Sequence, residues 1–278
     1  MLDVAVIGCG IVGANVAYLL SQHKLRAAVF EKENDVSMGT TRANSAIVHA
    51  GYDPEPGTAM ARLNVRGSAL TKEQCAAFDV KYRQIGSLVL AFSDEEMATV
   101  RRLYENGVAN GVPGVRVLTR EETLAMEPNL SDAVCGALYA PSAAIVEPWD
   151  LALALAEAAV ENGVELHLET AVTGAEKISG GWRLHTAKGD FEARAVVNAA
   201  GVEADLVAAM AGEPGFTTIP SRGEYYLLDK SQGYVVNHVV FQCPNRDGKG
   251  VLVSPTVHYN LIVGPNAEPS GREDVSTQ

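Results

Sequence analysis

The sequence predicts an α/β protein: a mainly parallel sheet with helices, plus an inserted α+β domain that contains a mostly antiparallel sheet. Three observations support this fold class. An apolar run at residues 2–7 leads into a glycine-rich turn and a helix, which is typical of a buried parallel strand. A second run of this kind returns much later, at residues 195–199, and intervening segments alternate apolar and polar residues. We therefore expect two domains, each made of two segments: 1–55 with 145–212, and 56–144 with 213–278.

The first strand, turn and helix predict a Rossmann-like dinucleotide site. Gly8 allows the tight turn after the strand, Gly10 allows backbone to approach a pyrophosphate, and Gly13 allows the helix to pack on the sheet. The N-terminus of that helix offers free N–H groups to the anion. A second strand at residues 25–30 ends at Glu31, whose carboxylate can accept hydrogen bonds from a ribose. An acid here disfavours NADP, but this motif alone does not separate NAD from FAD.

The remaining elements follow from periodicity and from residues that begin or end helices. Ser93 with Glu96, and Thr119 with Glu122, have the spacing of capping boxes at helix starts. Pro148 and Gly163 bracket a strongly apolar helix. The predicted helices cover residues 58–78, 94–110 and 149–162, with a short one after Thr119, and the further strands cover 82–92, 164–168, 171–178, 182–186, 225–228, 234–241, 250–253 and 260–263.

Composition excludes several functional classes. The 278 residues contain 22 Lys and Arg against 34 Asp and Glu, a formal net charge of −12, which disfavours a nucleic-acid surface. No apolar stretch is long enough for a membrane span, and because a strand pattern begins at Leu2 we expect no signal peptide. The cysteines are scattered without metal-ligand spacing, so we expect reduced thiols and no metal. We expect a cytoplasmic protein that is either free or peripheral to the membrane.

Several motifs in order carry a resemblance to a known family. They are VAVIGCGIVG with FEK, TTRANSAIVHAGYDPEPGT, VVNAAG, SRGEYYLLD, GKGVLVSPT and VGPNA. This set resembles the D-amino-acid-oxidase superfamily of FAD-dependent enzymes, in particular its glycerol-3-phosphate oxidase/dehydrogenase branch, with L-2-hydroxyglutarate oxidase as a near relative. The resemblance implies FAD as the cofactor. The long loop at residues 40–52 also argues against an ordinary NAD dehydrogenase. We expect a C-terminal portion of the family fold to be absent from these residues.

The resemblance also implies roles for individual residues. His49 is the expected base, because it lies in the most specific motif and an imidazole titrates near neutral pH. The alternative interpretation is that His49 is a polar loop residue whose side chain only hydrogen-bonds to backbone groups. Lys249 is expected to be catalytic and, with Arg222, to bind an anionic substrate, although either can be a solvated turn charge. The expected FAD contacts are Gly8, Gly10, Gly13, Glu31, Lys32, Thr41, Asn44, Ser45, Val172, Ala200 and Gly201.

These expectations combine into a functional hypothesis. The chain is expected to oxidise a small anionic secondary alcohol by hydride transfer to FAD, with glycerol 3-phosphate as the leading substrate. The electron acceptor is oxygen, a quinone or a partner protein, and neither nucleic acid nor an integral membrane segment is involved. L-2-hydroxyglutarate is the alternative substrate. A different class of hypothesis is a non-catalytic FAD-binding subunit or fragment.

Overall fold

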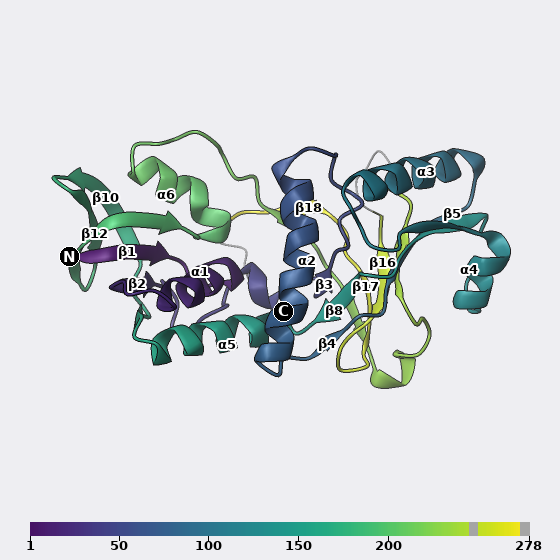
Figure 1. Ribbon diagram of the computed structural model, residues 1–278, viewed down its shortest axis with the longest axis horizontal. Coiled ribbons are helices and arrows are strands. Elements are labelled where there is room, and N and C mark those ends of the chain that lie inside the picture. The colour runs from purple at the N-terminus through teal and green to yellow at the C-terminus, as the bar shows by residue number, and fades with distance from the viewer. Residues whose placement is uncertain (245–249, 273–278) are drawn as a thin grey trace. The chain divides into compact units, whose positions relative to one another are not determined.

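The computed structural model describes residues 1–244 and 250–272. The chain divides into two compact units, each assembled from separate segments. The first unit contains Met1–Asn44, Pro148–Arg222 and Pro269–Gln278, and the second contains Ser45–Glu147 and Gly223–Glu268. Figure 1 shows the consequence along the colour ramp: purple, teal and green elements occur together in the first unit.

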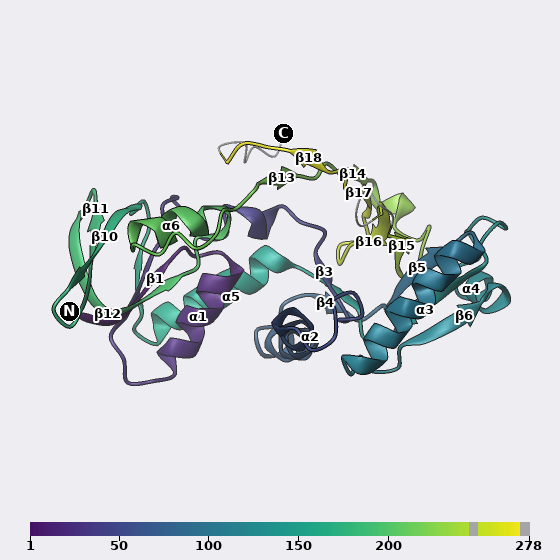
Figure 2. The ribbon, with the colours of Figure 1, turned by 90° about the horizontal axis from the view of Figure 1, so that it is seen from above.

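A six-stranded sheet forms the centre of the first unit. Four strands, β12, β1, β2 and β9, are parallel neighbours, and β10 and β11 extend the sheet beside β12 as an antiparallel pair (Figure 2). The predicted mainly parallel sheet is therefore confirmed. The strands are β1 Leu2–Ile7, β2 Ala27–Phe30, β9 Glu165–His167, β10 Val172–Ile178, β11 Gly181–Thr186 and β12 Gly189–Asn198.

Three α-helices pack around this sheet. α1 (Ile11–Ser21) contacts β1 and β2 and lies against α5 (Pro148–Glu161), and α6 (Ala204–Met210) contacts β10 and β12. Small residues make the α1 contact close, because Ala14 and Ala17 are fully buried. Buried apolar side chains around Phe30 form the core beneath the strands. The carboxyl ends of β1, β2 and β12 thereby come together, as parallel pairing requires.

The second unit contains a seven-stranded sheet in the order β14-β17-β16-β15-β5-β7-β6. Its neighbours are antiparallel except for β15 and β5, which are parallel and join the two sequence segments of this unit. This confirms a mostly antiparallel sheet. The strands are β5 Ser87–Ala91, β6 Arg116–Thr119, β7 Gly136–Ala140, β14 Tyr226–Leu228, β15 Val239–Gln242, β16 Leu252–Pro255 and β17 Leu261–Gly264.

Smaller elements complete the description. β8 lies between β3 and β4 in a three-stranded sheet, and β13 pairs with β18. Helix α3 packs on β5, β6 and β7, and α4 packs on β6 and β7. These elements are β3 Ile47–Val48, β4 Tyr82–Arg83, β8 Ala144–Val146, β13 Ser221–Arg222, β18 Glu268–Pro269, α2 Ala59–Ala77, α3 Asp94–Ala109 and α4 Arg120–Met126, with 3-10 turns η1 Thr40–Arg42, η2 Gly201–Glu203 and η3 Lys230–Gln232.

Helix starts follow the predicted capping residues. The Ser93 side chain accepts from the Glu96 N–H at the start of α3. At α4, Thr119 and Glu122 form a full capping box, in which each side chain accepts from the other's backbone N–H. Among the described residues, no helix is both long enough and apolar enough to cross a membrane.

Two strand predictions were wrong in extent. The run predicted as one strand at residues 82–92 is divided into β4 and β5, which belong to different sheets. Gly86 causes the break: it has a φ of +73°, and a Cβ there would lie 2.8 Å from the Tyr139 ring. The run predicted at 234–241 is a strand only from Val239, because its first residues follow the η3 turn and pair with no strand.

Candidate cofactor and active site

Two glycines of the β1–α1 turn are required by the packing of the chain itself. Gly8 has a φ of +95°, and a Cβ there would lie 2.5 Å from the Ala199 carbonyl oxygen. A Cβ on Gly13 would lie 1.9 Å from the Gly8 carbonyl oxygen, a distance that no side chain can occupy. These contacts bring the start of α1 close to β1 and to the end of β12. Any β-carbon would force the helix away from the strands.

Gly10 differs from its two neighbours in the motif. It is the N-cap residue of α1, with extended backbone and no side-chain cap. A Cβ on Gly10 would meet only the Thr41 Oγ1 atom, at 3.0 Å. That same oxygen accepts a hydrogen bond from the Ile11 N–H at 3.0 Å. Gly10 is thus half-buried beside a helix N-terminus, and the packing of the chain does not by itself explain the glycine.

The Glu31 carboxylate lies directly beside this turn. It is only 7% exposed, and its two oxygens accept from the Cys9 N–H at 2.7 Å and the Glu33 N–H at 3.0 Å. An ionised carboxylate has about four acceptor positions, so these two bonds leave capacity for ribose hydroxyls. Burial first, and then the Glu31 and Asp35 charges, raise the pKa of Cys9 to about 12. Cys9 is consequently a protonated thiol at neutral pH.

Other residues predicted to contact FAD lie around the same strand ends of the first unit. Asn44 donates from Nδ2 to the Thr40 and Thr41 carbonyls, which fixes the η1 turn beside Gly10. Lys32 forms an exposed ion pair with Glu203 at 2.9 Å. Ala200 and Gly201 follow the end of β12, Val172 begins β10, and Arg222 is half-buried in β13.

The second unit contains His49 and Ser45. His49 follows β3 and is exposed, with its ring stacked on Phe241 of β15 at a centroid distance of 5.8 Å. The Ser45 hydroxyl lies 2.5 Å from the Tyr225 hydroxyl. These contacts bring together the 45–49 segment and residues near positions 225 and 241. Lys249 lies outside the described residues.

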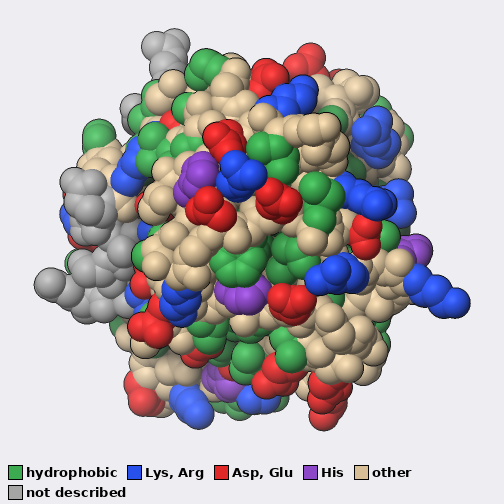
Figure 3. All heavy atoms as spheres, turned by 90° about the vertical axis from the view of Figure 1, so that its left-hand side faces the viewer, with side chains coloured by type: hydrophobic (Ala, Val, Ile, Leu, Met, Phe, Trp, Pro, Cys, Tyr) green, Lys and Arg blue, Asp and Glu red, His purple; other side chains and the backbone are tan. Residues whose placement is uncertain are grey.

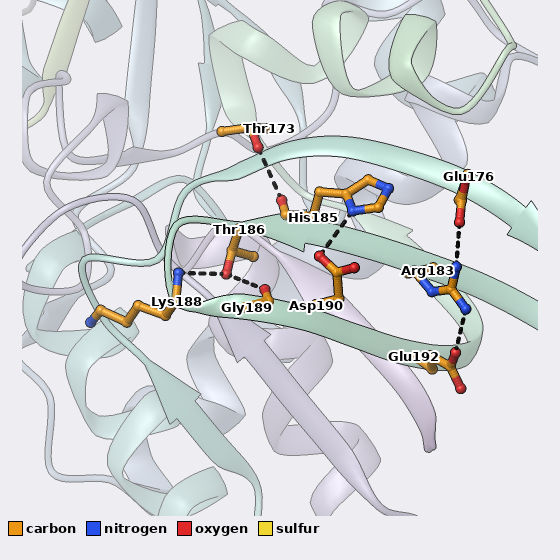
Figure 4. Close-up of polar contacts among 9 residues, drawn as sticks. All are labelled: Thr173, Glu176, Arg183, His185, Thr186, Lys188, Gly189, Asp190 and Glu192. Atoms are coloured by element: carbon orange, nitrogen blue, oxygen red, sulfur yellow. Dashed lines mark hydrogen bonds and ion pairs between the residues drawn. The ribbon is translucent and has the colours of Figure 1, made fainter.

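Four histidines outside the 45–49 segment lie beside carboxylates. His167, His185, His238 and His258 each have a carboxylate partner within 3.3 Å. Figure 4 shows one of these pairs, in which His185 Nδ1 lies 2.9 Å from an Asp190 oxygen on the exposed β11–β12 hairpin. The His238–Glu127 pair is by contrast largely buried.

Charged side chains at one end of the first unit show no separation by sign. Figure 3 shows acidic and basic side chains interspersed over this face. Figure 4 shows Arg183 between Glu176 and Glu192, at 2.7 and 3.0 Å. Within residues 1–244 and 250–272, no group of His, Cys, Asp and Glu is arranged to hold a metal ion.

Two buried acids were not singled out in the sequence. Asp205 forms a two-pronged ion pair with Arg272, whose Nη1 lies 2.7 Å and Nη2 2.5 Å from its oxygens. Those bonds, together with the Thr218 N–H, hold the pKa of Asp205 well below its usual range. Glu127, 1% exposed, accepts from the backbone N–H groups of Asn237 and His238 at 2.8 and 2.7 Å. No local motif indicates either pairing, because the partners are distant in the sequence.

Comparison with known proteins identifies relatives. The profile of the family described as FAD dependent oxidoreductase matches residues 3–278. Glycerol 3-phosphate dehydrogenase of Caloramator mitchellensis is 50% identical over 268 residues, covering 96% of this chain and 56% of that protein. Glycerol 3-phosphate oxidase of Mycoplasma pneumoniae is 31% identical (95% of this chain, 71% of the relative), and L-2-hydroxyglutarate dehydrogenase of Escherichia coli K12 is 32% identical (96% and 64%).

A solved structure gives the same result. The dithionite-reduced L-α-glycerophosphate oxidase of Mycoplasma pneumoniae with FAD bound superimposes with a TM-score of 0.91 at 30% identity, covering 98% of this chain and 73% of that one. The chain thus spans little more than half the length of one curated relative, 56%, and about three quarters of this structure. The resemblance read from the motifs is confirmed, as is the Rossmann-like fold class with FAD as the family's cofactor. The chain belongs to the family of FAD dependent oxidoreductases.

Proposed function

We propose that the protein oxidises a small anionic secondary alcohol, with glycerol 3-phosphate as the leading substrate. The observation that carries this proposal is the Gly10 backbone, uncapped by any side chain at the N-terminus of α1 and next to the Glu31 carboxylate. It provides main-chain donors for a pyrophosphate and an acceptor for the ribose of FAD. The 50% identity to a protein named glycerol 3-phosphate dehydrogenase supports the choice of substrate.

The first unit supplies most of the proposed FAD contacts. Backbone at Gly8, Gly10 and Gly13 would hold the pyrophosphate, and Glu31 would accept from the ribose. The remaining proposed contacts are Lys32, Thr41, Asn44, Ser45, Val172, Ala200 and Gly201. Bound FAD supplies the hydride acceptor that no amino-acid side chain can provide.

The proposed base is His49, which removes the proton of the substrate hydroxyl. Its ring is supported by the Phe241 ring and is exposed, so a substrate can reach it. Arg222 and Lys249 are the proposed cations that hold the anionic group of the substrate, because guanidinium and ammonium groups suit phosphate and carboxylate oxygens. Holding that group fixes the carbinol carbon relative to His49.

The second candidate substrate is L-2-hydroxyglutarate. The 32% identity to the Escherichia coli L-2-hydroxyglutarate dehydrogenase favours it. Both candidates are anionic secondary alcohols, so the same base and cations serve either one. Oxygen, a quinone or a partner protein is the proposed final electron acceptor.

Anaerobic titration of the full-length protein tests this proposal. The purified protein is expected to show flavin absorbance that glycerol 3-phosphate bleaches in the absence of oxygen. L-2-hydroxyglutarate is tested in parallel, and glycerol and inorganic phosphate serve as matched controls for the alcohol and the anion. Bleaching by L-2-hydroxyglutarate alone would exchange the two substrates. Flavin that no hydroxy compound bleaches would leave a non-catalytic FAD-binding protein.

A further inference from the structure

The Ser45–Tyr225 contact joins two segments of the second unit that lie 180 positions apart. The 2.5 Å between the two hydroxyl oxygens is at the short end of the range for O–H···O hydrogen bonds. Both residues are half-buried, so water competes with this bond less than at an open surface. Ser45 is therefore hydrogen-bonded to a residue of the second unit's other sequence segment, Gly223–Glu268.

Tyr225 is itself held in place from the other side. Gly264 has a φ of +142°, and a Cβ there would lie 3.0 Å from Cδ1 of the Tyr225 ring. The preceding residue is clamped, because the Glu224 N–H donates to the Asn266 Oδ1 atom at 2.7 Å. The next residue, Tyr226, begins β14 and pairs with Val263. The phenol is thus presented to Ser45 by a rigid segment.

Ser45 precedes His49 on an equally constrained segment. The Val146 N–H donates to the Ala46 carbonyl at 3.0 Å, and Ala46 has a φ of +57°. Ile47 and Val48 then pair with β8, just before His49. A change in how Ser45 is held therefore affects the beginning of the segment that carries the proposed base.

The direction of the hydrogen bond follows from acidity. A phenol, with a reference pKa of about 10, is a stronger donor than an aliphatic alcohol. The contact geometry allows either hydroxyl to donate, and on the ground of acidity we assign Tyr225 as the donor to Ser45 Oγ, which leaves the hydrogen of Ser45 to donate elsewhere. A hydroxyl that accepts one hydrogen bond becomes a better donor in the next one.

We propose that Tyr225 is a positioning residue that acts through Ser45. By donating to Ser45 Oγ it fixes the orientation of the Ser45 hydroxyl and makes that hydroxyl a stronger donor for the proposed bond to FAD. This inference rests on the proposed function, in which Ser45 contacts FAD, but it assigns to Tyr225 no contact with FAD or substrate. Tyr225 thus determines cofactor affinity without belonging to the cofactor site.

A double-mutant cycle on the full-length protein tests the proposal. The variants are Tyr225→Phe, which keeps the ring against Gly264, Ser45→Ala, and both together. The matched control is Tyr226→Phe, because Tyr226 is the neighbouring tyrosine and is 76% exposed. The measurements are the dissociation constant of FAD from the apoprotein and the thermal unfolding of the apoprotein, neither of which requires turnover.

Each single variant is expected to weaken FAD binding about fivefold, the usual effect of losing one hydrogen bond. The double variant is expected to be no weaker than Ser45→Ala alone, and Tyr226→Phe is expected to match the wild type. Independent, multiplying effects of the two substitutions, or an unchanged FAD affinity in Tyr225→Phe, would overturn the proposal.

The outcome separates this inference from the proposed function. If FAD binds with the expected coupling but no hydroxy compound bleaches it, the positioning role stands and the oxidation is wrong. If glycerol 3-phosphate bleaches the flavin and the coupling is absent, the oxidation stands and the positioning role is wrong. A full-length protein that takes up no FAD overturns both.

Discussion

In the first unit, Gly8, Gly10 and Gly13 occupy one short turn, and two of them are required by backbone atoms that lie within 3 Å of where a side chain would begin. In the second unit, Ser45 and His49 contact Tyr225 and Phe241, which are nearly two hundred positions away. The first region is built from neighbours in sequence, and the second from neighbours in space.

This difference affects how each region responds to substitution. Backbone contacts leave no space in this turn for a further atom, so a single added methyl group displaces a helix. A site assembled from distant side chains can lose one contact and keep its fold, because the strands beneath it hold the position. We therefore expect substitutions in the turn to affect stability and substitutions in the second region to affect chemistry.

Gly13→Ala is expected to have the largest effect on stability. If the protein tolerated this substitution, the difference inferred between the two regions would be wrong. A Cβ at 1.9 Å from the Gly8 carbonyl oxygen is expected to cost about 3 kcal/mol or more in the free energy of unfolding. Urea unfolding of the apoprotein measures it. The control is Gly67→Ala in α2, where no atom lies within 4 Å of the new Cβ and a small gain in stability is expected.

His49→Gln is expected to slow chemistry without loss of fold. Removing a general base lowers a rate by about 10²–10⁴-fold, so the anaerobic rate of flavin reduction is expected to fall by that factor. FAD content is expected to stay at the wild-type level. His23→Gln, an exposed residue after α1, is the control. Equal reduction rates in the wild type and His49→Gln would remove the base from the mechanism.

Gly10→Ala tests the difference between Gly10 and Gly13 within the same turn. Its Cβ meets only the Thr41 hydroxyl, so the stability of the apoprotein is expected to fall by less than about 1 kcal/mol. FAD affinity is expected to fall about tenfold, because the methyl group occupies the space that the pyrophosphate approaches. Calorimetric titration with FAD measures this. Parallel losses of stability and affinity would contradict the distinction between Gly10 and Gly13.

Asp205→Asn tests a long-range contact inside the first unit. Because Arg272 lowers the pKa of folded Asp205, the stabilisation is present above the unfolded pKa of about 3.9 and is lost as pH falls below it. The variant is expected to have a lower Tm at pH 7 and a flatter decline of Tm from pH 5 to pH 3. The control is Asp190→Asn on the exposed hairpin. Curves that stay parallel over this range would exclude the linkage.

Arg183→Met is expected to have the smallest effect. Arg183 contacts two glutamates, but all three side chains are more than a third exposed. Exposed ion pairs contribute little and are screened by salt. The Tm at physiological ionic strength is expected to match the wild type within error. A decrease in Tm as large as that of Asp205→Asn would show that the greater exposure of Arg183 does not make its ion pairs weaker than that of Arg272.

The sequence was informative wherever a structural requirement was local. Gly8 and Gly13, the capping box at Thr119, and the parallel strands that end just before Glu31 and Ala199 were all predictable, because each depends on a few adjacent residues. The break at Gly86 was not, because it depends on the ring of Tyr139 in a neighbouring strand. The late start of β15, at Val239, was likewise not predictable.

The fold class and the β1–α1 glycine turn were predictable from the sequence alone, since backbone sterics and strand periodicity act over a handful of positions, and the family followed from the resemblance that its motifs carry. Only the tertiary structure decided that β15 pairs with β5, that Tyr225 meets Ser45, and that Arg272 meets Asp205. Such pairs form when packing of the whole chain brings distant segments together. Their side chains carry no local signal of the partner, because the free energy that selects them is shared among many contacts.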